Sequence, residues 1–255
     1  MLKATLLKAT QASGKILQQY FNGPFEVSSK TTLNDLVTEV DKRSETAIID
    51  IIRAEYADHF ILSEEVGEMK MASPYKWIID PIDGTVNYAN GIPICCVSIG
   101  VEKDGEMILG AVYNPFMNEF FLAEKGQGAT LNDQPIHVSK KTDLDNAFLV
   151  TGFPYHYDEI PNSPLLVFER FMRKGIPVRR LGSAAIDLCW VACGRFDGFW
   201  EPHLQAWDSA AGYLIVQEAG GKVTDYSGQV YSPYQKKILA TNGHIHEQML
   251  EVINQ

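Results

Sequence analysis

The sequence predicts an α+β first half joined to an α/β second half, and three observations lead to this fold class. Residues 1–145 begin with two segments of helical periodicity and continue as strand-like runs separated by tight turns. Residues 146–255 instead alternate short helical and strand-like segments. No repeat, low-complexity tract or flexible linker separates the halves, so we expect two domains that share an interface.

The first half is predicted to consist of two helices and a largely antiparallel sheet. The opening helix ends at Asn22-Gly23-Pro24, and the second helix carries an isoleucine-rich face suited to packing on a sheet. A turn at Lys103-Asp104-Gly105 joins two long apolar runs into a hairpin. The expected elements are helices over 2–21 and 41–56 and strands over 60–63, 77–79, 94–102, 107–113 and 119–123.

The second half is predicted to alternate helices with short strands. The helix over 207–219 has a clear end, because Gly220-Gly221 favours the left-handed turn that closes helices. The other expected elements are helices over 165–173, 183–193 and 244–253 and strands over 148–151, 178–181, 198–201, 222–224 and 238–240.

The composition excludes several classes of protein. The chain has 22 Lys and Arg against 32 Asp and Glu and no basic run, so we expect no direct nucleic-acid partner. No segment approaches the roughly 20 apolar residues that span a bilayer, and residues 1–21 lack the apolar core of a signal peptide. We therefore expect a cytoplasmic protein without a membrane partner. Its four cysteines are expected to be buried and reduced; they are Cys95, Cys96, Cys189 and Cys193.

Four carboxylates stand where predicted strands end or a helix begins. Glu64 ends one strand, Asp80 and Asp83 follow the next, and Asp208 lies at a helix start. Taken singly, each has an ordinary interpretation as part of a turn, a solvated loop or a helix cap. If they converge, their oxygens form a cluster that suits Mg²⁺ or Mn²⁺, and those ions would offset the repulsion between the carboxylates.

A glycine and a threonine follow Asp83 directly. Gly84 lets the backbone approach a ligand closely, and if Thr85 begins a helical turn, both amides point outward without a helical partner. A helix start of this kind binds phosphate. Divalent cations beside a phosphate site predict phosphoryl chemistry, in which an activated water attacks phosphorus in line.

These motifs resemble those of the inositol monophosphatase family. DPIDGTVNY, which starts at Asp80, resembles one family signature, and WDSAAGYLIVQEAGG, which starts at Trp207, resembles the other. SEEVG, DLVTEVD and GSAAIDLCWVACGRFDGFWEP fit the same family, so the resemblance covers nearly the whole chain. It implies a layered αβαβα sandwich of the inositol monophosphatase/fructose-1,6-bisphosphatase type. It also implies a homodimeric, Mg²⁺-dependent, lithium-sensitive phosphomonoesterase.

The resemblance further implies which residues hold metal. Glu64, Asp80 and the backbone carbonyl of Ile82 would bind a first ion. Asp80, Asp83 and Asp208 would bind a second, and Glu64 would help to place a weaker third ion. The implied cofactor is therefore two to three Mg²⁺ ions, which Mn²⁺ could replace.

The remaining implied roles concern water and substrate. Glu64 and Thr85 would orient the attacking water with support from Asp41, and Lys30 would lie near the active-site loop. The implied partner is a small phosphorylated polyol. The residues that would contact it are Asp83, Gly84, Thr85, Ala184 and Glu201.

The sequence leaves alternatives open for the substrate of the protein and for its role. Glu201 suits the paired hydroxyls of a polyol, but residues 150–155 do not preserve the serine-containing loop of animal enzymes. Glu201 equally suits an amine, so histidinol phosphate is an alternative substrate, followed by nucleotide 3′-phosphates and fructose 1,6-bisphosphate. Val86-Asn87-Tyr88 favours the inositol branch, and His203 is the histidine nearest to a candidate substrate group. An alternative of another class is a binding partner of the transcription machinery.

Overall fold

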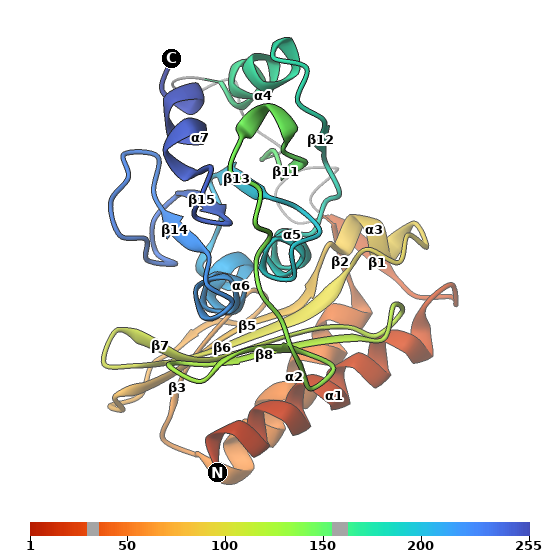
Figure 1. Cartoon of the computed structure of the whole chain (residues 1–255). Coiled ribbons are helices and arrows are strands. Elements are labelled where there is room, and N and C mark those ends of the chain that lie inside the picture. The colour runs from red at the N-terminus through yellow and green to blue at the C-terminus, as the bar shows by residue number, and fades with distance from the viewer. Residues whose placement is uncertain (30–35, 155–162) are drawn as a thin grey trace.

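The chain folds into five stacked layers (Figure 1), seen in a computed structural model that describes residues 1–29, 36–154 and 163–255. Two helices cover one face of an eight-stranded sheet, and two further helices lie between that sheet and a five-stranded sheet. Two more helices cover the outer face of the second sheet. The layers therefore follow the order αβαβα.

The first layer consists of α1 (Leu2–Tyr20) and α2 (Glu39–Glu55). Both bury an apolar face against the sheet, as their periodicity predicts. A capping box starts α2: the Thr38 hydroxyl accepts from backbone amides, and the Asp41 carboxylate accepts from the Thr38 N–H. This cap matters for function, because it fixes Asp41 beside the cavity described below.

The eight-stranded sheet is antiparallel except for the parallel pair β3 and β5, which confirms the prediction for the first half. The strand order is β10-β9-β8-β7-β6-β5-β3-β4. The strands are β3 (Phe60–Ser63), β4 (Gly67–Met69), β5 (Tyr75–Asp83), β6 (Cys96–Lys103), β7 (Glu106–Asn114), β8 (Glu119–Glu124), β9 (Gly128–Leu131) and β10 (Gln134–Pro135). The predicted hairpin turn joins β6 to β7.

The strand β5 corrects one prediction, because it does not end at Asp80 but continues to Asp83. Its pairing with β6 shifts register between these two aspartates, and Pro81 lies within the shift, a position that tolerates a residue without an N–H. In a regular strand, residues three apart point to opposite faces. The irregularity therefore allows both carboxylates to line one cavity.

The second half carries a mixed sheet in the order β12-β11-β13-β15-β14. Here β11 is parallel to both neighbours, whereas β15 is antiparallel to β13 and β14. The strands are β11 (Leu149–Thr151), β12 (Val178–Arg179), β13 (Gly198–Pro202), β14 (Lys222–Thr224) and β15 (Lys237–Thr241). The predicted alternation of helices and strands is confirmed.

Helices α5 (Ala184–Ala192) and α6 (Ala206–Glu218) lie between the two sheets. They contact protein on nearly all sides, which explains their almost continuous apolar sequence. The outer helices α4 (Pro164–Arg173) and α7 (His246–Ile253) each bury only one face. The start of α5 and the start of α6 therefore lie inside the molecule, where they can shape a site.

Several short elements are not predicted from the sequence patterns. The strands β1 (Val27–Ser29) and β2 (Leu36–Thr38) pair with each other, and a 3-10 helix (Leu144–Asn146) precedes β11. Such segments are too short to show a period. Lys30, expected near the active-site loop, lies outside the described residues.

The four cysteines are free thiols. Cys95 packs on the α1 and α2 side of the sheet and Cys96 on the opposite side, as expected for neighbours in a strand. The expectation of burial is wrong for Cys193, which is half-buried because it follows the last turn of α5.

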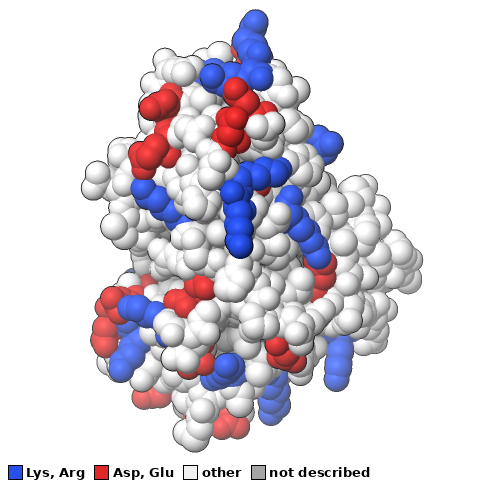
Figure 2. Space-filling model, viewed as in Figure 1, with Lys and Arg blue, Asp and Glu red and all other residues white. Residues whose placement is uncertain are grey.

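Charged side chains and helix composition can be described for the surface and for the described helices. On the face shown in Figure 2, acidic and basic side chains are interspersed without a continuous basic patch. None of the described helices is both long enough and apolar enough to cross a bilayer.

Candidate active site

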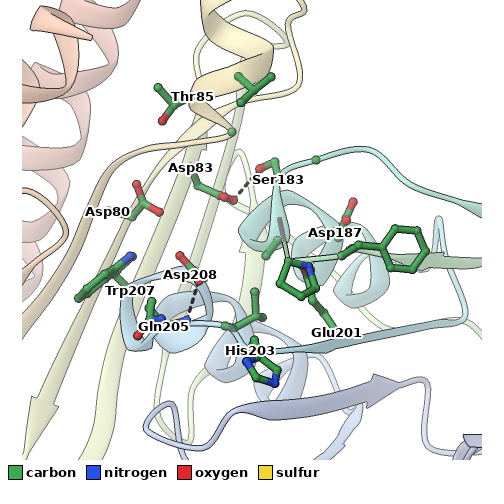
Figure 3. A pocket seen from close by; sticks show the side chains of 18 of the residues that line it. Asp80, Asp83, Thr85, Ser183, Asp187, Glu201, His203, Gln205, Trp207 and Asp208 are labelled. Carbon is green, nitrogen blue, oxygen red and sulfur yellow. Dashed lines mark hydrogen bonds between the residues drawn. The ribbon is translucent and has the colours of Figure 1, made fainter. Parts of the chain in front are cut away.

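A cavity of about 570 Å³ lies where β5, α3 (Thr85–Ala89), α5, β13 and α6 meet. Figure 3 shows Asp80, Asp83 and Asp208 pointing toward a common space within it. The predicted site residues that line the cavity are Glu64, Asp80, Ile82, Asp83, Gly84, Thr85, Ala184, Glu201 and Asp208. Asp41 is fully buried behind Thr85. We call residues 80–85 the β5 wall and residues 201–208 the α6 wall.

The β5 wall is fixed by hydrogen bonds from its own backbone and from α2. Asp80 Oδ1 accepts from the Ile82 N–H at 3.0 Å. Ser44 Oγ, on α2, donates to the carbonyl of Pro81 at 3.0 Å. One oxygen of Asp80 is thus held by the backbone, and its carboxyl group also forms a hydrogen bond with the Glu64 side chain.

Gly84 is required by the geometry of this wall. Its φ of 92° lies in the left-handed region, and it is the N-cap of α3. A Cβ atom at this position would lie 2.9 Å from the carbonyl oxygen of Ile94 and 3.2 Å from that of Gly182. Backbone from two other segments therefore closes around Gly84, and the expectation that Thr85 begins a helix is confirmed.

Thr85 and Asp41 form a hydrogen-bonded pair at the edge of the cavity. Thr85 Oγ1 lies 3.2 Å from Asp41 Oδ1 and 3.0 Å from the Ile82 carbonyl oxygen, so one proton serves two acceptors. Asp41 Oδ2 accepts from the hydroxyl and the N–H of Thr38. Burial raises the pKa of Asp41 to about 7, although the bonds from Thr38 oppose that rise.

Asp83 connects the β5 wall to the second half of the chain. Its Oδ2 accepts from Ser183 Oγ at 2.6 Å and from the Ala185 N–H at 2.7 Å, at the start of α5. Burial raises the pKa of Asp83 to about 6, and these bonds limit the rise because they favour the ionised form. One carboxylate thereby aligns two segments that are about 100 residues apart.

Glu201 lies at the end of β13, 9% exposed, among residues of the second half. A Cβ atom on Gly152 would overlap its carboxyl group, so only glycine leaves room for this side chain. Burial, followed by the charge of Asp208, raises its pKa well above the ordinary value. Ala184 lines the same cavity from the first turn of α5.

Asp208 occupies the third position of α6 and belongs to a capping box with Gln205. Its Oδ2 accepts from the Gln205 N–H at 2.7 Å, while the Gln205 side chain accepts from the Asp208 N–H. The ordinary interpretation of Asp208 as the N-cap residue is therefore wrong, since Gln205 is the N-cap and Asp208 supports the cap from the third helical position. This place is compatible with a ligand role because Oδ1 of Asp208 remains for the cavity.

The electrostatics of the cluster favour a bound cation. Burial first, and then the charges of the neighbouring carboxylates, raise the pKa values of Asp80 and Asp208 well above normal. In the described part of the chain, no ion pair with Lys or Arg involves Asp80, Asp83 or Asp208. An all-oxygen donor set of this kind fits Mg²⁺ or Mn²⁺.

The carboxylates line the cavity without yet forming a closed ligand shell. Within residues 1–29, 36–154 and 163–255, no three His, Cys, Asp or Glu side chains have the close grouping of a finished metal site. Hydrogen bonds hold one oxygen of each of Asp80, Asp83 and Asp208 toward the protein.

The cavity also contains residues that the sequence patterns do not single out. Arg180 lines it beside Gly182, and Asp187 lines it from α5. Asp187 Oδ1 is buried and has no hydrogen-bond partner among the described residues, and burial raises the pKa of this carboxyl well above normal. An aspartate inside an otherwise apolar helix was the available signal, since a buried carboxylate needs a reason.

Comparisons with known proteins identify the family of this chain. The Inositol monophosphatase family model matches residues 2–255. The chain is 43% identical over 251 residues to an inositol-1-monophosphatase from Synechocystis sp., which covers 96% of this chain and 86% of that protein. It is 39% identical over 246 residues to the Nus factor SuhB from Escherichia coli, covering 96% and 92% of the two chains.

Comparison with solved structures leads to the same family of proteins. The structure of an inositol monophosphatase from Anabaena (Nostoc) sp. superposes with a TM-score of 0.88 at 41% identity, covering 97% of this chain and 93% of that one. The predicted layered fold of the inositol monophosphatase/fructose-1,6-bisphosphatase type is therefore confirmed.

Proposed function

The chain belongs to the inositol monophosphatase family, and on that premise we propose that it is a Mg²⁺-dependent phosphomonoesterase for myo-inositol monophosphates or similar small alcohol phosphates. The observation that carries this proposal is the convergence of Glu64, Asp80, Asp83 and Asp208 on one cavity beside the glycine-capped start of α3. Carboxylate clusters next to a phosphate-sized opening are typical of metal-assisted phosphoryl transfer.

The proposed cation ligands divide between the two walls. Glu64, Asp80 and the Ile82 carbonyl would hold one ion, and Asp80, Asp83 and Asp208 a second, with a weaker third near Glu64. Mg²⁺ or Mn²⁺, when bound, supplies positive charge for the phosphate oxygens and acidifies a water. Lithium inhibition is proposed for the same reason, because Li⁺ would compete for carboxylate oxygens.

The protein groups that position water are proposed to be Thr85, Asp41 and Glu64. The Thr85 proton points toward Asp41 or the Ile82 carbonyl, so the lone pairs of Oγ1 can accept a hydrogen bond from a water in the cavity. When that water attacks phosphorus, Thr85 can take its proton and pass its own to Asp41. The bonds from Thr38 keep Asp41 in place for this transfer.

Substrate recognition is proposed to use both walls. The amides of Gly84 and Thr85 would bind the phosphate, since Gly84 gives the ester close access to the backbone. Asp83, Ala184 and Glu201 would face the alcohol. A cavity of about 570 Å³ suits a phosphorylated six-membered polyol.

The proposal is tested by phosphate release from inositol 1-phosphate. Activity should require Mg²⁺, and Asp83→Asn should lower kcat/KM by about 10³-fold, because several kcal/mol of charge stabilisation are lost. Glu68→Gln, which changes an exposed carboxylate on β4, serves as the control. Activity that ignores both Mg²⁺ and Asp83→Asn would refute the proposal.

The substrate itself is decided by a panel measured at fixed Mg²⁺. We expect inositol monophosphates to have the highest kcat/KM, followed by histidinol phosphate, nucleotide 3′-phosphates and fructose 1,6-bisphosphate. A clear preference for histidinol phosphate would show that Glu201 binds an amine and would replace inositol as the assigned substrate, leaving the chemistry unchanged.

A role as binding partner of the transcription machinery is the second candidate. It is favoured by the 39% identity to a protein named Nus factor SuhB. The inactive Asp83→Asn variant should then still retain RNA polymerase subunits in a pull-down from the native host. If it retains none, the phosphatase proposal stands alone.

Three further properties belong to the proposal. We propose a cytoplasmic homodimer, which light scattering of the purified protein would test, and two domains that divide near residue 145. Separate expression of residues 1–145 and 146–255 would test the division. We expect neither part to bind Mg²⁺ alone, because Asp83 and Asp208 come from different parts.

A further inference from the structure

The link between Glu201 and Asp208 has a strained backbone. His203 has a φ of 68°, in the left-handed region. In the described residues, the other non-glycine positions with positive φ are all Asn or Asp, whose short side chains suit this conformation; they are Asn22, Asp104, Asn118, Asn132 and Asp133. A bulkier residue keeps such a conformation only when its surroundings hold it there.

Lys236 holds this link at two points. Its backbone carbonyl accepts a hydrogen bond from the His203 N–H. Its Nζ donates to Gln205 Oε1 at 2.8 Å. The next residue, Lys237, pairs with Pro202 in the β13–β15 ladder, so the sheet fixes the backbone from which Lys236 reaches across.

Gln205 carries this contact on to Asp208. The Gln205 N–H donates to Asp208 Oδ2 at 2.7 Å, and the Gln205 side chain accepts from the Asp208 N–H. The same side chain therefore receives Lys236 Nζ and caps the helix that begins with Asp208. Movement of Gln205 would move the carboxylate that faces the cavity.

We propose that Lys236 is a positioning residue, which acts through Gln205 to hold Asp208 in the orientation that binds a divalent cation. The inference rests on the proposed function, because it takes Asp208 to be a cation ligand. It deepens that function, since it places part of the control of cation affinity on an exposed lysine outside the cavity lining.

The charge of Lys236 and its hydrogen bond have opposite effects on cation binding. A positive charge near Asp208 repels a cation, so removing the charge alone would tighten binding. Removing a hydrogen bond that orients a ligand weakens binding. If Lys236→Met weakens cation binding, the hydrogen bond of Lys236 is its main effect; if the substitution tightens binding, the charge of Lys236 is its main effect.

Thermal unfolding over a range of Mg²⁺ and Mn²⁺ concentrations measures this effect without any substrate. In Lys236→Met, we expect the half-saturating concentration to rise about three- to tenfold, the lower end of what outer-shell partners contribute. Lys236→Arg should recover most of the loss. Lys237→Met is the matched control, since Lys237 Nζ lies over the Tyr226 ring and should leave the value unchanged.

Two results would overturn the inference. One is a half-saturating concentration in Lys236→Met that equals or falls below that of the native protein. The other is additivity between Lys236→Met and Gln205→Ala, because residues that act through one contact should not add. If the native protein itself shows no stabilisation by either ion, the proposed cation site fails, and this inference fails with it.

Discussion

The β5 wall and the α6 wall hold their carboxylates in different ways. On the β5 wall, Asp83 accepts from buried donors on α5, and the buried Asp41 supports Thr85 from α2. On the α6 wall, Asp208 accepts from Gln205, which is exposed and depends on an exposed lysine. Exposed hydrogen bonds exchange with water and hold less firmly than buried ones.

This difference suggests that the two walls of the cavity have different tasks, one in the chemical step and one in binding. The β5 wall is held from both sides by packed helices, because Ser44 on α2 donates to its Pro81 carbonyl and a backbone N–H at the start of α5 donates to Asp83. The α6 wall is joined to β13 by a short link in which His203, with a φ of 68°, and Gln205 are exposed. We therefore expect changes on the β5 wall to affect the chemical step and changes on the α6 wall to affect affinity and selection.

The largest effect is expected from the pair of Thr85 and Asp41. Thr85→Ala should lower kcat by about 10²- to 10⁴-fold with little change in KM, because it removes the group that receives the proton of the attacking water. Thr46→Ala, on the exposed side of α2, is the matched control. Steady-state kinetics with inositol 1-phosphate gives both constants.

Combining Thr85→Ala with Asp41→Asn sharpens this prediction. The double variant should be about as slow as the slower single variant, since the two groups act as a unit. If kcat of the double variant falls by the product of the two single-variant factors, Thr85 and Asp41 act separately.

A smaller effect is expected at Glu201. Glu201→Gln should lower kcat/KM for inositol 1-phosphate about tenfold, in line with the loss of hydrogen bonds to a charged group. Hydrolysis of p-nitrophenyl phosphate, which lacks polyol hydroxyls, should change little. Equal losses for both substrates would mean that Glu201 supports the fold of the site and not the choice of substrate.

The smallest effect is a dependence of stability on pH in the metal-free protein. A carboxyl group whose pKa is raised by folding stabilises the protein at low pH, and this contribution is lost as pH rises through the raised value. The pKa is raised to about 6 for Asp83 and to about 7 for Asp41. The stability that these two carboxyl groups contribute is therefore lost as pH rises toward neutrality. The pKa of His246 is lowered to about 4, and its opposite effect is confined below its ordinary 6.5.

Between pH 6.5 and pH 8, in chelator, Tm should therefore fall by about 2–4 °C, because the part of the two titrations above pH 6.5 is worth about 1 kcal/mol and each kcal/mol shifts Tm by about 2–4 °C. Mg²⁺ should raise Tm more at pH 8 than at pH 6.5, and Asp208→Asn should reduce the fall. A metal-free Tm that rises over this range would contradict the account of the carboxylates.

Much of the fold and of the cluster could be predicted because they depend on local patterns. Strand ends and helix starts are visible as breaks in periodicity, and Glu64, Asp80, Asp83 and Asp208 occupy such breaks. Gly84 could be assigned because a glycine directly after Asp83 lets the backbone approach a ligand closely.

The parts that could not be predicted depend on packing between distant segments. The extension of β5 through Pro81 requires the partner strand β6, and the role of Asp187 requires α5 to lie between two sheets. Arg180 and Lys236 belong to segments without a motif, so only the folded chain brings them to the site or its border. The division of the chain near residue 145 stays a prediction.

The most direct test of the account is to count the cations that the protein binds without substrate. Titration with Mn²⁺, followed by electron paramagnetic resonance, should show at least two bound ions per chain, with one fewer in Asp208→Asn and unchanged binding in the surface variant Glu68→Gln. Mn²⁺ binding that is absent, or that is the same in Asp208→Asn as in the native protein, would contradict the claim that these carboxylates form a cation site.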